Sequence, residues 1–439
     1  MLTIIYFLLY NLLVYPLIFF ISHIIAIFNH KVRKGISGRY QTIREVNDFI
    51  GDTKSQTDNI FLIHCASMGE FEHIKPFVRA LKQRLPDSKI VVMFFSPSGY
   101  ENVKSAPGVD LFIYTPFDWW LPVWRLFKTL NPRALIIAKY DVWPNQIWMA
   151  RFLGVPRFLI NATLYQNSSR IKIPLRWFLQ TIYSAFNRIL TISEADKSLY
   201  TRLARKGRIV VVGDTKYDQV VFRSEESRKR NVLPKGFCDG KTVFVAGSTW
   251  PEDEVHLIPA LKAIARKKHD LQIIICPHEP TPPHIAELKE HLHPLNVRLY
   301  SELATSSKPS NEIFVIVIDK IGLLANLYSV ADVAYVGGSF KQNIHNVLEP
   351  AAYGIPVLFG PINQNSHEAQ LLKQTGGGIE VNGEENIKSH LEKIFSEEQY
   401  RNALGQAAKA LVNDKLGATG RTVEQVLKYF DKSNYKLED

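Results

Sequence analysis

Residues 334–361 constrain the fold of this chain most, because an apolar run, a glycine pair, a helical pattern and a second apolar run follow one another there. The run Val330–Val336 predicts a buried strand that stops at Gly337 and Gly338, and Ile355–Phe359 predicts the next strand. Strands that are joined through a helix pair in parallel. The segment therefore predicts a βαβ unit.

The loop between these two strands has the composition of an anion site. Glycines let the backbone approach a ligand, and the N–H groups at a helix start favour phosphate. Asn346 opens the helical pattern, which ends near Gly354, and Glu349 one turn further is well placed to accept hydrogen bonds from ribose hydroxyls. The structural alternative is that the glycines merely end a strand and Asn346 merely caps a helix.

Apolar runs alternate with amphipathic stretches along the rest of the chain, which predicts parallel sheets flanked by helices. A charged stretch without apolar pattern, 223–231, interrupts the alternation. We expect one domain over 37–220, a linker over 221–240 and a second domain over 241–439. The expected strands are Asn59–Cys65, Lys89–Phe95, Leu111–Tyr114, Ala134–Ala138, Arg157–Ile160, Arg188–Ile192, Ile209–Val212, Thr242–Ala246, Leu271–Cys276, Val297–Tyr300, Ile313–Ile318, Val330–Val336 and Ile355–Phe359.

Residues 2–28 contain no charged side chain and are long enough to cross the roughly 30 Å hydrocarbon core of a bilayer as a helix. Pro16 is tolerable in a membrane helix. A helix lying flat on the membrane needs a polar face, and none is visible. We expect residues 1–28 to form one transmembrane anchor. By the positive-inside rule, the rest of the chain is cytoplasmic because these cations follow: Lys31, Arg33, Lys34 and Arg39.

Composition narrows the class of protein further. Hydrophobic residues make up 46% and charged residues 22% of the chain, as in folded globular proteins. The net charge of +11 favours an anionic partner such as a membrane surface, a phosphorylated substrate or nucleic acid. Only Cys65, Cys238 and Cys276 occur, without metal-ligand spacing, so we expect no structural disulfide and no metal site.

Two stretches, 117–128 and 170–178, mix aromatic and basic residues. Helix packing explains some of these side chains. An anionic membrane surface also suits them, because aromatic rings lie at the headgroup level and cations attract lipid phosphates. No recognisable nucleic-acid-binding module accompanies them, so we expect no nucleic-acid partner.

Ser67-Met68-Gly69-Glu70 follows the first strand after the anchor. Ser-x-x-Glu before a helix is a capping box, in which Ser67 caps and Glu70 reaches back to its N–H. The functional alternative places Glu70 at the carboxyl end of a strand as a general base, which a sugar hydroxyl needs in order to attack.

Two motifs together carry a family resemblance. The cassette HNVLEPAAYGIPVLFGP at 345–361 resembles the nucleotide signature of GT-B glycosyltransferases, and His64–Phe71 resembles the Ser-x-Gly-Glu loop of 3-deoxy-D-manno-octulosonic acid (Kdo) transferases. The resemblance implies an α/β GT-B fold of two Rossmann-like domains. It also implies inverting transfer of Kdo from CMP-Kdo to a lipid A precursor in lipopolysaccharide synthesis, at the inner membrane, without a metal or cofactor.

The resemblance assigns catalytic roles in the first domain. Glu70 is the base, and Lys216 matches a lysine that stabilises the transition state, although a solvated loop lysine is the alternative. Lys139 stands where the family has a glutamate, and Asp141 keeps a second carboxylate. Strand alternation would keep these two side chains on one side, with Lys139 either pairing with Asp141 or contacting the Kdo carboxylate.

The resemblance also assigns the CMP site to the second domain. His278 replaces a family arginine and Leu323 a family glutamate, so main-chain contacts are expected there. Ordinary strand ends and helix starts are the alternative. The expected CMP contacts are Pro277, His278, Ile321, Gly322, Leu323, Asn346, Val347, Leu348 and Glu349, and the expected donor-site loop residues are Ser248, Thr249, Gly338 and Ser339.

Two other functions fit the same features. A different GT-B enzyme, such as a lipid-A-disaccharide synthase or an epimerase, would use a UDP-sugar. A membrane-tethered binding protein without catalysis would explain the departures at Lys139 and Leu323.

Overall fold

The computed structural model describes residues 2–52, 59–103, 105–234, 236–303 and 314–431. Met1 of the predicted anchor, Lys235 of the predicted linker, Ile313 of a predicted strand and the end of the predicted second domain, 432–439, lie outside these residues. The chain divides into a first unit of Met1–Gln219 with Leu416–Asp439, and a second unit of Val220–Lys415. Each unit is built around one parallel sheet.

The first unit contains a seven-stranded sheet in the order β3-β2-β1-β4-β5-β6-β7. All its neighbouring strands pair in parallel, and most of its strand residues are buried because helices cover both faces. Its strands are β1 (Ile60–Cys65), β2 (Lys89–Phe94), β3 (Leu111–Tyr114), β4 (Ala134–Ala138), β5 (Arg157–Ala162), β6 (Arg188–Thr191) and β7 (Ile209–Val211).

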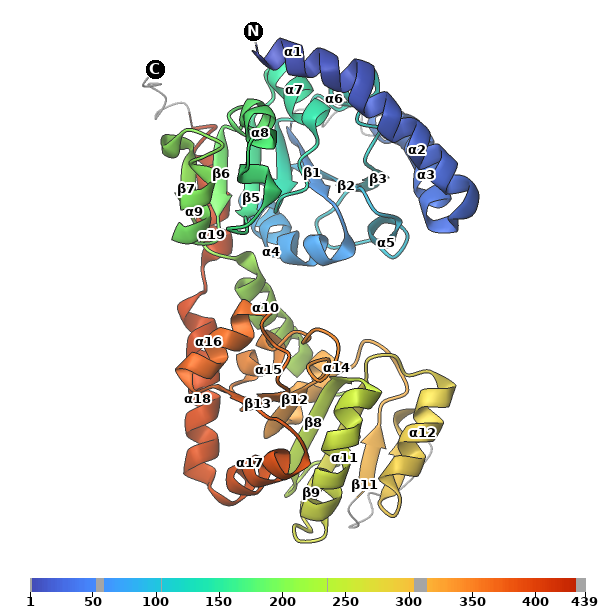
Figure 1. Cartoon of the computed structure of the whole chain (residues 1–439), viewed down its shortest axis with the longest axis vertical. Coiled ribbons are helices and arrows are strands. Elements are labelled where there is room, and N and C mark those ends of the chain that lie inside the picture. The colour runs from blue at the N-terminus through green and yellow to red at the C-terminus, as the bar shows by residue number, and fades with distance from the viewer. Residues whose placement is uncertain (1, 53–58, 104, 235, 304–313, 432–439) are drawn as a thin grey trace. The chain divides into compact units, whose positions relative to one another are not determined.

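The helices of the first unit begin with an apolar N-terminal helix interrupted by a π-helical segment, η1. Figure 1 shows α1 beside α6 and α7 of this unit, and α2 beside α3. The helical segments are α1 (Leu2–Leu9), η1 (Tyr10–Val14), α2 (Tyr15–Phe28), α3 (His30–Asp52), α4 (Met68–Arg84), α5 (Pro97–Tyr100), α6 (Trp120–Leu130), α7 (Pro144–Phe152), η3 (Ser169–Ile171), α8 (Leu175–Tyr183), α9 (Glu194–Tyr200), η4 (Lys206–Arg208) and α19 (Ala418–Leu427). Helix α10 (Thr215–Arg228) begins in the first unit and continues into the second.

The second unit repeats the architecture with the order β10-β11-β9-β8-β12-β13-β14, again parallel throughout. Its strands are β8 (Thr242–Thr249), β9 (Leu271–Pro277), β10 (Asn296–Leu299), β11 (Phe314–Val317), β12 (Val333–Val336), β13 (Val357–Phe359) and β14 (Gly378–Glu380). Its helical segments are α11 (Pro251–Ala265), α12 (Pro282–Leu292), α13 (Tyr300–Leu303), α14 (Leu324–Leu327), η5 (Tyr328–Val330), α15 (Leu348–Tyr353), α16 (His367–Thr375), α17 (Glu384–Ser396) and α18 (Glu398–Asp414).

The predicted fold class is confirmed: the chain has the GT-B fold, in which one apolar N-terminal helix is followed in sequence by two Rossmann-like units. The domain limits differ from the predicted ones in two places. Helix α10 runs through Arg228, so the start of the predicted 221–240 linker is helical. Residues from Leu416 onward belong to the first unit, where α19 packs against α4, so the second domain ends before the predicted residue 439.

Candidate active site

The first sheet reverses its strand order between β1 and β4, which lie side by side although they are not consecutive. In open α/β sheets, ligands bind outside the carboxyl ends of the strands at such a switch point. Glu70 lies just beyond the end of β1, and Lys139 and Asp141 lie just beyond the end of β4. Strand topology therefore gathers three of the four predicted catalytic residues at one place.

Glu70 lies in the first turn of α4 and is buried. The Ser67 hydroxyl accepts a hydrogen bond from the Glu70 N–H at 3.4 Å, so the predicted N-cap is present. The carboxylate of Glu70 accepts from the N–H of Ala66 at 2.6 Å, one residue before the expected Ser67. Burial raises the pKa of Glu70, which moves it toward the range in which a carboxylate serves as a base at neutral pH. The capping role and the catalytic role are compatible in this geometry.

A buried histidine, His64 at the end of β1, connects the two strand ends. Its Nε2 lies 2.8 Å from Oδ2 of Asp141, and its Nδ1 lies 3.1 Å from the hydroxyl of Thr115. Trp143 Nε1 also donates to Asp141, at 3.1 Å. Although burial opposes it, these contacts hold the pKa of Asp141 below its usual value. His64 belongs to the predicted motif His64–Phe71, but nothing in the sequence indicated its hydrogen bond to Asp141.

Lys139 has a left-handed backbone with a φ of 60°. Strand β4 ends at Ala138, so strand alternation does not determine the sides of Lys139 and Asp141. Both side chains nevertheless act electrostatically on Glu70. The charge of Lys139 lowers the pKa of Glu70 against the larger effect of burial. Lys139 therefore acts electrostatically on the candidate base.

Lys216, the fourth predicted catalytic residue, lies in the first turn of α10 rather than in a loop. Its ammonium group pairs with Asp214 at 3.1 Å, and its N–H donates to the same carboxylate at 2.9 Å. The predicted alternative of a solvated loop lysine is wrong, because this side chain is ion-paired and mostly buried.

The second sheet has its own switch point between β8 and β12. Ser248 and Thr249 end β8, while Gly338 and Ser339 follow β12, so the predicted donor-loop residues do come together. The two loops approach so closely that a Cβ on Gly337 would lie 2.3 Å from the carbonyl oxygen of Ser248. Only glycine fits there.

Several donor-loop groups bond to neighbouring parts of the second unit, namely to α11 and to the end of β13. The hydroxyl of Thr249 donates to Glu254 at 2.7 Å, and the N–H of Gly338 donates to Asp253 at 2.8 Å. The hydroxyl of Ser339 accepts from the N–H of Gly360 at 2.6 Å. Both Thr249 and Ser339 are fully buried, so their side chains shape the loop.

Three aromatic rings stack at this switch point. His278 stacks on Trp250 and on His345, with ring centroids 4.8 Å and 4.3 Å apart. Trp250 Nε1 donates to Nε2 of His345 at 3.0 Å. Burial, with a smaller effect of His278, lowers the pKa of His345 to about 4. The sequence indicated His278 but not its two ring partners, because their proximity depends on the strand order.

Pro277 and His278 were expected to contact CMP through their main chain, and one of these main-chain groups is already hydrogen-bonded within the protein. Pro277 ends β9, and the N–H of His278 donates to the carbonyl oxygen of Thr249 at 2.9 Å. That main-chain donor is thus engaged within the protein, which leaves the exposed imidazole as the group His278 presents.

The helix expected from Asn346 begins later, as α15 at Leu348, and has six residues. Asn346 still caps the turn, because its side-chain oxygen accepts from the N–H of Leu348 at 3.1 Å. So short a helix has only a small dipole, and the predicted contribution of its N-terminus to phosphate binding is correspondingly reduced. Val347 is the N-cap by position and makes no side-chain cap bond.

Glu349 forms an ion pair with Arg223 of α10 at 3.1 Å. The Ile321–Leu323 turn fits the predicted main-chain role, because Gly322 has a φ of 91° and Ile321 is 86% exposed. Leu323 packs against the apolar cluster under the sheet. Within the described ranges, no group of three or more His, Cys, Asp or Glu side chains is placed to hold a metal ion.

Known proteins of similar sequence are Kdo transferases. The family model for 3-deoxy-D-manno-octulosonic-acid transferase matches residues 36–219. A 3-deoxy-D-manno-octulosonic acid transferase from Haemophilus influenzae is 26% identical over 95% of this chain and 96% of its own length. One from Chlamydophila psittaci is 28% identical over 85% of this chain and 86% of its own length. Over most of its length, this chain is thus similar to Kdo transferases.

Solved structures resemble the chain in fold. A UDP-GlcNAc 2-epimerase from Neisseria meningitidis, solved with UDP-GlcNAc bound, superimposes with a TM-score of 0.56. It is 13% identical and covers 84% of this chain and 100% of its own. At that identity, the likeness shows the GT-B fold alone.

Proposed function

We propose that this chain is a Kdo transferase, which transfers Kdo from CMP-Kdo to a hydroxyl of a lipid A precursor, with inversion, in lipopolysaccharide synthesis. The observation that carries the proposal is the buried carboxylate of Glu70 at the switch point of the first sheet, with a pKa raised by burial. A carboxylate in that state accepts the proton of the attacking hydroxyl as the new bond forms.

The His64–Asp141 pair supports Glu70 in this role. Because Asp141 holds its charge and is hydrogen-bonded to His64, the end of β4 keeps a fixed position beside the end of β1. Lys139 supplies a positive charge near Glu70, and we assign it to the carboxylate of the sugar acid. We assign Lys216 to the negative charge that develops on the leaving phosphate. In this step its ammonium group would leave Asp214, with which it forms an ion pair in this structure.

The second unit is assigned to the CMP moiety. The exposed ring of His278, backed by Trp250, suits stacking on a base, and Glu349 suits the ribose hydroxyls. The left-handed Gly322 and the exposed turn around it leave room for main-chain contacts with the nucleotide. We propose that the reaction needs no metal, since the departing CMP is stabilised by cationic side chains.

Product analysis tests the proposal. Full-length protein in detergent is incubated with a defined lipid A precursor and either CMP-Kdo or UDP-GlcNAc, and the lipid is analysed by mass spectrometry. Addition of Kdo from CMP-Kdo alone supports the proposal. Transfer or epimerisation of the UDP-sugar would support the other GT-B function, and absence of product from either donor with retained CMP binding would support the binding protein.

The likeness to Kdo transferases and the apolar N-terminal helix also favour attachment to the cytoplasmic side of the inner membrane. Cations at the end of this helix would bind anionic headgroups there. These cations include Lys31, Arg33 and Lys34, which are exposed.

A further inference from the structure

The N-terminal helix contacts the first unit along almost its whole length. Near its start, the ring of Tyr6 lies 5.5 Å from that of Phe178 on α8. Near its end, His23 Nε2 lies 3.1 Å from the hydroxyl of Tyr40, and Phe19 lies 5.2 Å from Phe117 between ring centroids. At about 1.5 Å per residue, the contacted length from Tyr6 to His23 is about 26 Å, close to the thickness of a bilayer core.

The middle of the helix is fixed by buried polar groups. The Tyr10 hydroxyl donates to Asp118 at 2.8 Å, and the Tyr15 hydroxyl accepts from the Asp118 N–H at 2.7 Å. Asn11 and Asn145 exchange two amide hydrogen bonds, at 3.0 Å and 2.9 Å. All these side chains are buried. The polar residues of the segment are thus satisfied by the first unit, and lipid could not satisfy them.

The π-helical segment explains how these residues share one face. The N–H of Tyr15 bonds to the carbonyl oxygen of Tyr10, five residues back, and Pro16 follows without an N–H of its own. The wider turn places the rings of Tyr10 and Tyr15 with centroids 5.8 Å apart, both toward Asp118.

A helix held in this way cannot cross a bilayer unless the surface that holds it enters the hydrocarbon too. That surface comprises α6, α7 and α8, which carry Arg125, Arg151 and Arg176, and the first two are exposed. A charged side chain at the bilayer centre is energetically costly. Crossing is therefore unfavourable for the helix in its docked position.

The opposite face of the helix is apolar and exposed. Ile5, Leu12, Phe20 and Ile27 are 45%, 68%, 65% and 67% exposed, and the helix has a mean hydropathy of 2.3. Neighbouring elements extend this face with large exposed side chains, namely Trp120, Phe152 and Trp177.

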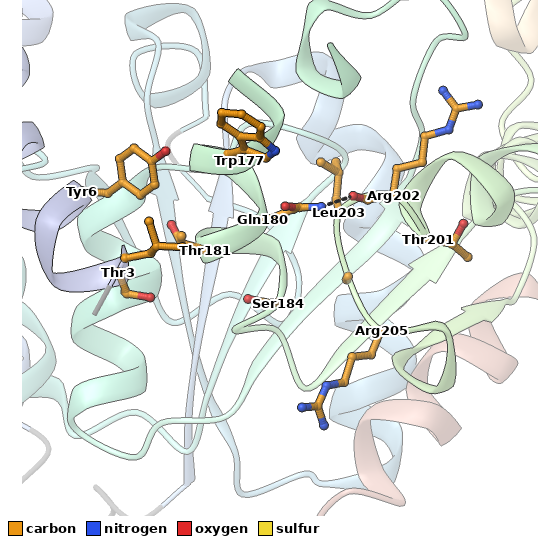
Figure 2. A pocket seen from close by; sticks show the side chains of 12 residues that line it. Thr3, Tyr6, Trp177, Gln180, Thr181, Ser184, Thr201, Arg202, Leu203 and Arg205 are labelled. Atoms are coloured by element: carbon orange, nitrogen blue, oxygen red, sulfur yellow. Dashed lines mark hydrogen bonds between the residues drawn. The ribbon is translucent and has the colours of Figure 1, made fainter. Parts of the chain in front are cut away.

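Two grooves flank α1 and share Thr3 as a lining residue. Figure 2 shows the first, of about 650 Å³, with Tyr6 on one wall, Trp177 on α8, and Arg202 and Arg205 beyond α9. The second, of about 710 Å³, is lined by Trp120, Trp124 and Trp148 together with Arg151. Indole rings with arginines at a groove edge suit the boundary between acyl chains and anionic headgroups.

We propose that the helix Leu2–Phe28 lies in the plane of one leaflet of an anionic bilayer while it stays docked on the first unit. Acyl chains cover its exposed face and the two flanking grooves, and the surrounding arginines and lysines bind lipid phosphates. Charge complementarity favours this occupant over a second copy of the chain, because the face is surrounded by cations, including Lys31, Arg33, Lys34, Arg125, Lys128 and Arg151. The inference does not depend on the proposed reaction.

Depth measurements test the orientation. Single cysteines replace Ile5, Leu12, Phe20 and Ile27, seven or eight residues apart on the exposed face, in a Cys238→Ser background. Cys65 and Cys276 are buried and should not react. Each variant is spin-labelled in phosphatidylethanolamine–phosphatidylglycerol vesicles, and depth is obtained from oxygen and nickel-chelate accessibility.

We expect four similar depths, about 5–10 Å below the phosphates. A crossing helix would place Leu12→Cys near the bilayer centre, with Ile5→Cys and Ile27→Cys near opposite surfaces, and that profile would overturn the proposal. Water-accessible labels on vesicle-bound protein, or labels shielded from both lipid and water by a second protein molecule, would overturn it as well.

Cross-linking in native membranes tests the docking separately. The pairs Tyr6→Cys with Phe178→Cys and Phe19→Cys with Phe117→Cys lie at opposite ends of the contact. Both should be joined by a short bismaleimide, whereas Leu12→Cys with Phe178→Cys should not. If either end pair failed to react in membranes but reacted in detergent, the helix would leave the unit when it enters lipid, and the proposal would fail.

Discussion

A contact between His64 and Asp141 joins the ends of strands β1 and β4, which are far apart in the sequence but adjacent in the first sheet. Their 2.8 Å contact lies behind Glu70, at the point where the order of the first sheet reverses. Because His64 is fully buried and its contact lowers the pKa of Asp141, the pair resists displacement of the β4 end relative to β1. The predicted base is thus placed beside a fixed polar pair.

Replacing Glu70 with Gln is expected to lower turnover by about two to four orders of magnitude, the range of general-base contributions. Gln retains an oxygen that can accept from the Ala66 N–H, so folding should be preserved. Because burial raises the pKa of Glu70, the acidic limb of kcat/KM should lie above the pH of an ordinary glutamate. Glu72→Gln on the same helix is the matched control. Near-normal turnover with modest loss of stability would leave Glu70 only its capping role.

Replacing Lys139 with Glu should raise the KM for CMP-Kdo and move the acidic limb of kcat/KM to higher pH. The sign follows from charge: Lys139 lowers the pKa of Glu70, and a carboxylate in its place would raise it. Lys139→Asn removes the charge with a residue that tolerates the left-handed backbone, so it separates charge from strain. Activity equal to or better than that of the parent would show that Lys139 has no role.

Replacing Glu349 with Ala should weaken CMP binding by about 1–3 kcal/mol, through lost charge-assisted hydrogen bonds to ribose. Arg223→Ala serves as control, because it removes the partner of the ion pair and leaves the carboxylate in place. Its guanidinium is 45% exposed, so the pair itself contributes little to stability. Unchanged CMP affinity of the Glu349 variant in calorimetry would refute the assignment.

Replacing Asn11 with Leu should destabilise the first unit by about 1–3 kcal/mol, because it leaves the amide of Asn145 buried with fewer partners. Leu12→Ala on the exposed face should change stability by less than about 0.5 kcal/mol. Thermal unfolding in lipid nanodiscs measures both. Equal stability of the two variants would mean that the helix attaches the protein to the membrane without stabilising the first unit. Deletion of residues 1–28 should likewise destabilise the unit as well as release it from membranes.

The fold was largely predictable because both sheets are buried on both faces, so most of their strands are apolar runs in the sequence. The predicted and observed strands differ mainly by a few residues at their ends. Strand β14 (Gly378–Glu380) was missed, since its three residues contain only one large apolar side chain. The return of α19 to the first unit was missed because it depends on a tertiary contact with α4. Sequence patterns carry no information about such a partner.

The candidate site was predictable where a motif lies within one loop, as for Glu70. The His64–Asp141 pair and the Trp250–His345 contact were not, because each depends on which strands become neighbours. The polar face of the N-terminal helix was missed for a different reason. The π-helical turn shifts the period, so Tyr10 and Tyr15, five residues apart, share a face that a regular helix of 3.6 residues per turn would not give them.

Acidification should unfold the second unit partly through His345. Its pKa is lowered to about 4, whereas an unfolded histidine titrates near 6.5, so between these values the unfolded chain binds more protons. The contribution of His345 to stability is thus complete above about pH 6.5 and is lost as the pH falls toward 4. Protonation would also remove the acceptor of the Trp250 Nε1–H bond. Denaturant unfolding from pH 7.5 to 4 should show a shallower pH dependence in His345→Phe than in the parent. An ordinary pKa for His345 in the folded protein, measured by NMR, would contradict the prediction.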